Sequence, residues 1–294
     1  MGVCIVSSGL SDPDDHLGAL AHAARAGLAA VDASAARIDQ IDLMINTGVY
    51  RDDNMCEPAM AAVIQHEMGM CLDPRRFPVE RPTFSFDLLN GAAGPMDALQ
   101  VVGAWFGGRG AGRAMIVTSD AHPSGSPRDD FPITAMGAAV VVEDVADCGF
   151  IATAHVSDQG VGDGQQGYCD IGAHREASRH EIVVERDDDF AERLLEITAD
   201  ALDSFLEEHA VDRDAVHLLC SQPLEGFAAA LADEVGLTKV PIDVHGRYGD
   251  VHTSALFAAY HHAHEEGVFA SGDLSVWVGS GAGFAVGCGL YRHP

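Results

Sequence analysis

Apolar and polar residues alternate along this chain between patterns typical of strands and patterns typical of helices. Leu17, Leu20, Ala24 and Leu28 recur at the spacing of one helix face, after a capping run of aspartates and proline. The first half is predicted to contain strands at about 3–8, 41–46, 83–87, 114–119 and 134–143, and helices at about 16–31, 57–69 and 92–106.

The second half repeats this order of elements after a loop at 158–180 that is rich in Gly, His and Arg. It is predicted to contain strands at about 149–157, 215–220, 240–243, 273–279 and 282–291, and helices at about 188–209, 224–235 and 252–267. Alternating strands and helices indicate an α/β protein, here with two similar halves at 1–147 and 148–294. The glycine-rich segment 107–112 follows a helix and precedes a strand, so we interpret it as a helix C-cap and not as a phosphate loop.

The stretch from Phe84 to Ala98 is where an apolar strand turns sharply into a helix. Asn90-Gly91 breaks the strand, and small residues open the helix that follows. An elbow of this kind projects one side chain at a helix N-terminus, where unpaired N–H groups and the helix dipole lower the pKa of a thiol and stabilise an oxyanion. It is the place to expect a nucleophile, but the side chain here is the methyl group of Ala92.

Length and charge narrow the classes of function. The chain has 294 residues, of which 47% are hydrophobic, and no apolar run approaches the roughly 20 residues of a membrane span. Its start lacks the basic segment of a signal peptide, so we expect a cytoplasmic protein. With 45 acidic residues, 17 basic ones and a single lysine, Lys239, the net charge of −28 argues against nucleic acid or an anionic membrane as a partner.

Seven cysteines are scattered along the chain without the short spacings of a metal site. Their number is odd, so the sequence indicates neither a disulfide framework nor a zinc site, and no metal is expected. We interpret most of them as small hydrophobic residues of the core.

The elbow resembles that of the ketoacyl synthase III branch of the thiolase-like condensing enzymes, which reads roughly Phe-Asp-x-x-x-x-Cys-x-Gly. Here the frame is Phe86-Asp87-Leu-Leu-Asn-Gly-Ala92-Ala-Gly94. The resemblance extends over nearly the whole chain, through the strand at 41–45, the helix at 58–69 and the glycine-rich turn at 279–284. It implies a thiolase-like fold of two duplicated mixed-sheet halves in five layers, α/β/α/β/α, with a mostly parallel five-stranded sheet in each half.

The resemblance also shows that the residues of the family's chemistry have changed. Ala92 stands at the position of the acyl-accepting cysteine, Ser221 at that of the catalytic histidine, and Asp250 at that of the asparagine. Serine cannot accept a proton near neutral pH, and an ionised Asp250 would repel the carboxylate of malonate. Cys220, beside Ser221, and His252, two residues beyond Asp250, are left as a displaced acid–base pair.

Of the family's other site features, the resemblance implies that the oxyanion donors are kept and that the segment that binds coenzyme A is not. The backbone N–H groups of Ala92 and Ala282 correspond to the oxyanion donors of the family. The long segment that grips coenzyme A is missing, because only Gly9-Leu-Ser-Asp12 joins the first strand to the first helix. The remaining basic candidates for a carrier contact read as ordinary surface charges: Arg75, Arg76, Arg175 and Arg179.

Three functions stay open at this point, all in fatty-acid, polyketide or related acyl-thioester metabolism. The first is a non-condensing subunit with an apolar acyl tunnel, paired with an active ketosynthase. The second is an acyltransferase or condensing enzyme in which alanine replaced the cysteine at position 92, and the third is a binding or assembly protein. The resemblance implies a homodimer or heterodimer that pairs the strand at 114–119, an acyl-coenzyme A or acyl carrier protein thioester as ligand, and no other cofactor.

Overall fold

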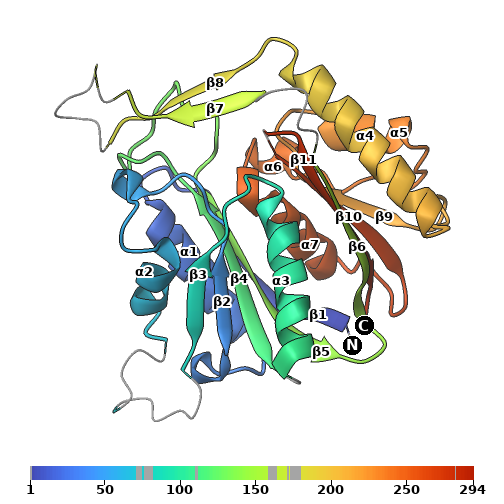
Figure 1. Ribbon diagram of the computed structural model, residues 1–294, viewed down its shortest axis with the longest axis horizontal. Coiled ribbons are helices and arrows are strands. Elements are labelled where there is room, and N and C mark those ends of the chain that lie inside the picture. The colour runs from blue at the N-terminus through green and yellow to red at the C-terminus, as the bar shows by residue number, and fades with distance from the viewer. Residues whose placement is uncertain are drawn as a thin grey trace.

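The computed structural model describes residues 2–70, 75, 82–109, 112–157, 164–170, 172, 180–281 and 283–294. Its framework is a nine-stranded sheet in the order β3-β2-β4-β5-β1-β6-β11-β10-β9 (Figure 1). The first half of the chain supplies β1 (Gly2–Ser11), β2 (Leu43–Asn46), β3 (Phe84–Asp87), β4 (Arg113–Asp120) and β5 (Met136–Val145). The second half supplies β6 (Gly149–Ser157), β9 (His217–Cys220), β10 (Leu274–Ser280) and β11 (Ala285–Arg292).

The two halves join through the pairing of β1 with β6, at Val3 and Phe150. The predicted boundary between residues 147 and 148 falls in the turn between β5 and β6. The prediction of mostly parallel sheets is wrong. Among the strands of the nine-stranded sheet that the structure describes, only the pairs β2–β3, β2–β4 and β9–β10 are parallel, because β5 and β11 return beside the preceding strands and run against both of their neighbours.

Three layers of helices enclose the sheet, so the layered α/β/α/β/α arrangement is confirmed (Figure 1). The helices α1 (Ala19–Asp32) and α2 (Met60–Glu67) cover the outer face of the first half, and α4 (Phe190–Glu208) and α5 (Phe227–Glu234) cover that of the second. Between the halves lie α3 (Gly94–Arg109) and α7 (Ala255–Glu265). The shorter elements are η1 (Ile38–Gln40), η2 (Asp52–Asn54), α6 (His245–Tyr248), η3 (His252–Ser254) and the two strands β7 (Gln165–Tyr168) and β8 (Val183–Arg186).

Strand residues divide between the inner and outer layers by simple alternation. On β4, Ile116 packs in the inner core with α3 and α7, whereas its neighbour Met115 packs with α1 and α2. On β10, Trp277 points inward and Val276 outward. Because successive side chains of a strand lie on opposite faces, the near-continuous apolar runs of the sequence follow from burial on both sides.

Two local predictions are wrong. The segment 240–243 is no strand: Val240 is 86% exposed, Pro241 has no N–H for a ladder, and the carbonyl of Ile242 accepts a hydrogen bond from the side chain of Gln222. The strand predicted at 114–119, β4, is not an edge, because it pairs with β2 and β5. The edge of the first half is β3.

Candidate functional site

The predicted elbow is present between β3 and α3. The chain leaves β3 at Asp87, turns through Gly91 with a φ of 51°, and begins α3 at Gly94. The backbone N–H groups of Ala93 and Gly94 donate to the carbonyls of Asn90 and Gly91, which closes the turn. Ala92 is therefore held, nearly buried, at the N-terminus of a 16-residue helix.

Asp87, the aspartate of the elbow motif, holds the surroundings of this turn together. Its carboxylate accepts hydrogen bonds from the backbone N–H groups of Met60 and Ala61 at the start of α2, and from the amide of Asn46. Arg51 forms an ion pair with it at 3.0 Å. The motif thus has a structural role that persists without the cysteine, because a carboxylate satisfies the free N–H groups at a helix N-terminus.

The glycine-rich closing turn lies against the elbow. A Cβ on Gly279 would lie 2.8 Å from the carbonyl oxygen of Ala92, so only glycine allows this approach. Gly281, two residues further on, lines the same cavity as Ala92. Ala282, the predicted second oxyanion donor, lies outside the described residues.

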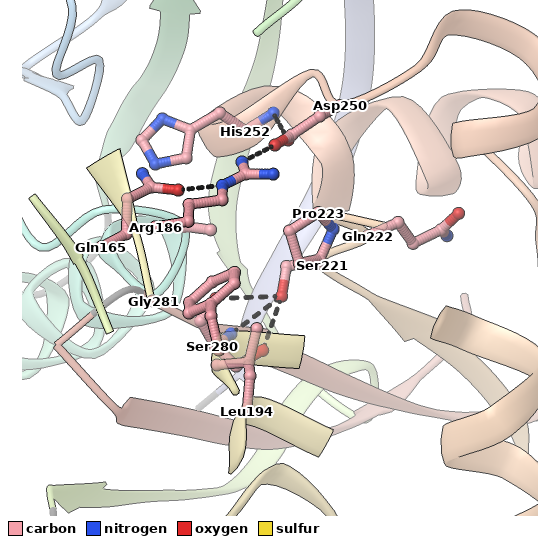
Figure 2. A pocket seen from close by; sticks show the side chains of 12 residues that line it. Gln165, Arg186, Leu194, Ser221, Gln222, Pro223, Asp250, His252, Ser280 and Gly281 are labelled. Atoms are coloured by element: carbon pink, nitrogen blue, oxygen red, sulfur yellow. Dashed lines mark hydrogen bonds and ion pairs between the residues drawn. The ribbon is translucent and has the colours of Figure 1, made fainter. Parts of the chain in front are cut away.

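Ser221, predicted to take the position of the family's histidine, lies at the end of β9. Its hydroxyl donates to the carbonyl oxygen of Ser280 at 3.2 Å, lies 2.9 Å from the hydroxyl of that residue, and accepts a hydrogen bond from its N–H at 2.9 Å (Figure 2). This hydroxyl is committed to the end of β10 and cannot serve as a base.

Cys220, the neighbour of Ser221, points the other way. It packs in the outer core with α4 and α5, and burial raises the pKa of its thiol to about 12. Among the described residues that line the cavity beside Ala92, Cys220 is absent. Alternation along β9 thus separates the two side chains that the sequence analysis paired.

Asp250 carries an unforeseen ion pair. Its Oδ2 accepts a hydrogen bond from Nη2 of Arg186 at 2.7 Å, and its Oδ1 accepts one from the backbone N–H of His252 at 2.9 Å. Arg186 ends β8, donates through Nε to the side chain of Gln165 on β7, and lies over the ring of Phe190 (Figure 2). At the position predicted to replace the family's asparagine, the carboxylate of Asp250 is thus paired with a guanidinium.

His252 forms a second buried ion pair next to the first. Its Nδ1 lies 3.1 Å from Oδ2 of Asp120, which is 1% exposed. Asp120 also accepts hydrogen bonds from the N–H groups of Val49 and Tyr50 and from the N–H and hydroxyl of Thr253. Burial alone would lower the pKa of His252, but the Asp120 carboxylate outweighs it and the pKa is raised.

The cavity beside Ala92 holds about 10 Å³, which is roughly the space of one water molecule. Besides the residues already described, Phe190 and Leu194 of α4 line it. A cavity of this size has no room for an acyl chain, so the described residues do not form the expected apolar tunnel at Ala92; Arg186 and two residues of α4 are part of its lining. A larger cavity of about 530 Å³ lies between the segment 49–56, Leu89, the end of β7 and residues Cys169 and Ile182.

The structure brings Ala92, Ser221, Asp250 and His252 to one cavity, as the alignment of motifs predicts. Arg186, Gln165 and Asp120 are residues of the site that the sequence motifs do not indicate. The available signal for Arg186 is an arginine two residues beyond the apolar run 182–184, and for Asp120 an acidic residue directly after a buried strand. Of the basic residues named from the sequence, Arg75 does not line this cavity, and Arg76, Arg175 and Arg179 lie outside the described residues.

Comparison with known proteins identifies the fold. Residues 206–293 match the family described as 3-oxoacyl-[acyl-carrier-protein] synthase III, C terminal. The 3-oxoacyl-(acyl carrier protein) synthase III of Pseudomonas aeruginosa superposes with a TM-score of 0.82 at 19% identity, over 100% of this chain and 99% of that one.

Two further solved structures agree. OleA of Xanthomonas campestris, with bound lauric acid and lauroyl-CoA, gives a TM-score of 0.81 at 13% identity, over 99% of each chain. The priming β-ketosynthase of the R1128 polyketide pathway gives 0.81 at 15%, over 100% of this chain and 96% of that one. The search of curated proteins found no match. Among the described helices, none combines the length and apolar character needed to cross a bilayer.

Proposed function

Since the chain has the thiolase-like fold of the ketoacyl synthase III proteins but not their cysteine, histidine and asparagine, we propose that it is a non-condensing member of acyl-thioester metabolism that acts as a partner subunit. The observation that carries this proposal is the ion pair between Arg186 and Asp250 in the cavity beside Ala92. It fills and neutralises the position where a condensing enzyme polarises its substrate.

The chemistry supports this proposal at each step. Thioester exchange needs a nucleophile, and the methyl group of Ala92 is none. Decarboxylation of a malonyl thioester needs donors aimed at the enolate oxygen as charge develops there. Ser221 donates to Ser280, and the carboxylate of Asp250 can only accept, so neither can supply such a donor.

The protein as written is expected to form no covalent adduct at residue 92 with any acyl-coenzyme A or acyl carrier protein, and to release no carbon dioxide from malonyl thioesters. Intact-protein mass spectrometry with a panel of acyl thioesters checks the first expectation, and a carbon dioxide assay the second. An adduct mapped by peptide analysis to Cys220 or another residue would overturn the non-catalytic proposal.

An acyltransferase or condensing enzyme that has lost its nucleophile is the second candidate, because the elbow keeps its geometry. Gly91 still makes the left-handed turn, and Ala92 still lies at the N-terminus of α3. A helix N-terminus at this point would activate a thiol if one were restored.

The partner in this proposal is a second copy of the chain or an active ketosynthase, and the acyl thioester or acyl carrier protein belongs to the assembled complex. Edge strand β3 supports such pairing. Phe84 on this strand is 53% exposed and stacks on Trp105 of α3, with ring centroids 6.0 Å apart, and Leu89 just beyond the strand is 52% exposed. An uncovered edge with apolar side chains is a template for another strand.

Phe84→Asp is expected to abolish self-association at micromolar concentration, because it places a charge on the proposed interface. Sedimentation velocity of the wild type should show a dimer, and of the variant a folded monomer. Val240→Asp, at an exposed apolar residue far along the chain, is the matched control and should leave the dimer intact. A dimer that tolerates the charge at Phe84 would exclude β3 as the contact.

A further inference from the structure

Two cysteines meet where the two halves of the protein join. Cys4 lies on β1 of the first half, and Cys148 lies in the turn that leads into β6 of the second. Their sulfur atoms are 2.6 Å apart, although the residues are separated by 144 positions in the sequence. A disulfide bond measures about 2.05 Å, so these sulfurs are within a fraction of an ångström of bonding distance.

The backbone fixes this approach. Gly149, directly after Cys148, has a φ of 94°, and a Cβ there would lie 2.5 Å from the carbonyl oxygen of Val3. Glycine therefore allows the turn to pass against β1 with nothing between them. The pairing of Val3 with Phe150 holds the strands in register on the other side of the turn. The backbone conformation thus places Cys148 beside Cys4, and the contact does not depend on a flexible side chain.

The surroundings of the pair are those of a structural bond and not of a reactive thiol. Cys4 is 2% exposed and Cys148 is 7% exposed. The sulfur of Cys4 also lies 3.6 Å from the hydroxyl of Tyr291. Burial, followed by the contact with Cys148, raises the pKa of the Cys4 thiol to about 12, so little thiolate forms in the folded protein.

The geometry points to Cys4 and Cys148 as an oxidative modification site, whose product is a disulfide that joins the first strand of one half to the turn that leads into the first strand of the other. The oxidant is a small-molecule disulfide. One cysteine thiolate attacks it and releases a small thiol, and the other attacks the protein sulfur of the mixed disulfide and releases the second. The protein sulfurs lose two electrons and two protons, which the oxidant takes up.

The expected consequence is a more stable protein. A cross-link between residues this far apart removes much conformational freedom from the unfolded chain. Oxidation should therefore raise the melting temperature by about 5–10 °C. Ser replacement of either cysteine should remove this dependence on redox state, whereas Cys288→Ser, at a buried cysteine on β11, should retain it.

The test has two arms, because buried thiols react slowly. In one, the folded protein is incubated with oxidised glutathione at mildly alkaline pH. In the other, the denatured, reduced protein is refolded with the same oxidant. Each sample is then denatured, alkylated with N-ethylmaleimide and mapped by mass spectrometry of its non-reduced peptides.

The expected result is a cross-linked peptide pair that contains Cys4 and Cys148, together with the higher melting temperature in the wild type and in Cys288→Ser. Two results would overturn the proposal. One is free alkylated Cys4 and Cys148 in both arms. The other is a disulfide that joins either residue to a different one of the seven cysteines.

Discussion

Asp120→Asn is expected to lower the free energy of unfolding by about 3–5 kcal/mol, the range measured when one partner of a buried ion pair is removed. The carboxylate accepts hydrogen bonds from the 49–50 segment and from Thr253, and pairs with His252. An amide at this position loses the charge and turns an acceptor into a donor that faces N–H groups. The residue connects the end of β4 to η3, which comes directly before α7, so both halves lose an anchor.

The size of this effect should depend on pH. Burial opposes the charge on both groups, but their attraction and hydrogen bonds outweigh it, so the pKa of Asp120 is lowered from 3.8 and that of His252 is raised from 6.5. The stabilisation through His252 is complete below pH 6.5 and is lost as pH rises through its higher folded pKa. The stabilisation through Asp120 is present above pH 3.8, and it is lost as pH falls through the lower pKa of Asp120 in the folded protein.

Urea unfolding of the wild type and of Asp120→Asn, measured between about pH 4 and 6.5 and again in alkaline solution, checks the prediction. The difference between wild type and Asp120→Asn should be largest between about pH 4 and 6.5 and should shrink in alkaline solution, where His252 is neutral in both. Asp130→Asn, at an exposed carboxylate paired with Arg128, is the control and should change stability by less than about 0.5 kcal/mol. A difference that does not vary with pH would mean that His252 is uncharged.

The fold could be predicted from the sequence because periodicity and family motifs agree for most elements. The segment around 94–106 has both an apolar helix pattern and the elbow before it, and it forms α3. The segment 240–243 is predicted as a strand but is none, because Val-Pro-Ile has the composition of a strand and a proline at its centre. Strand order is not written in local patterns, and for this reason β4 was assigned to an edge that β3 occupies.

The candidate site was predictable in its positions and not in its interactions. Ala92, Ser221 and Asp250 could be located because each lies in a motif with a fixed place in the fold. Arg186 could not be located from the sequence, because its contact with Asp250 spans 64 residues and depends on where β8 lies relative to the cavity. Charged residues on such a segment look like ordinary surface charges until a partner is seen.

Ala92→Cys is the variant that separates a non-condensing subunit from an enzyme that has lost its nucleophile. The N-terminus of α3 should lower the pKa of the new thiol and make it reactive. Even so, the cavity beside it holds about 10 Å³, and the Arg186 side chain remains in the way. The single variant should therefore be acylated slowly by acetyl-coenzyme A and hardly at all by medium-chain thioesters.

Arg186→Ala in the Ala92→Cys background is expected to open this cavity and to raise the rate of acylation at position 92 by medium-chain thioesters on the order of 100-fold, the scale of effect that small misplacements of reacting groups have. Time-resolved intact-protein mass spectrometry gives the rates. Arg193→Ala in the same background is the matched control, because Arg193 lies on α4 over the ring of Phe284 and does not line the cavity.

Malonyl thioesters should lose no carbon dioxide in any of these variants, since Ser221 and Asp250 are unchanged and supply no donor to an enolate. Equal acylation of the single and double variants by long chains would show that Arg186 does not close the site. Rapid acylation of Ala92→Cys alone, with every chain length, would favour an enzyme whose cysteine has been replaced. Slow acylation that only Arg186→Ala relieves would instead support a subunit whose acyl site is closed by its own arginine.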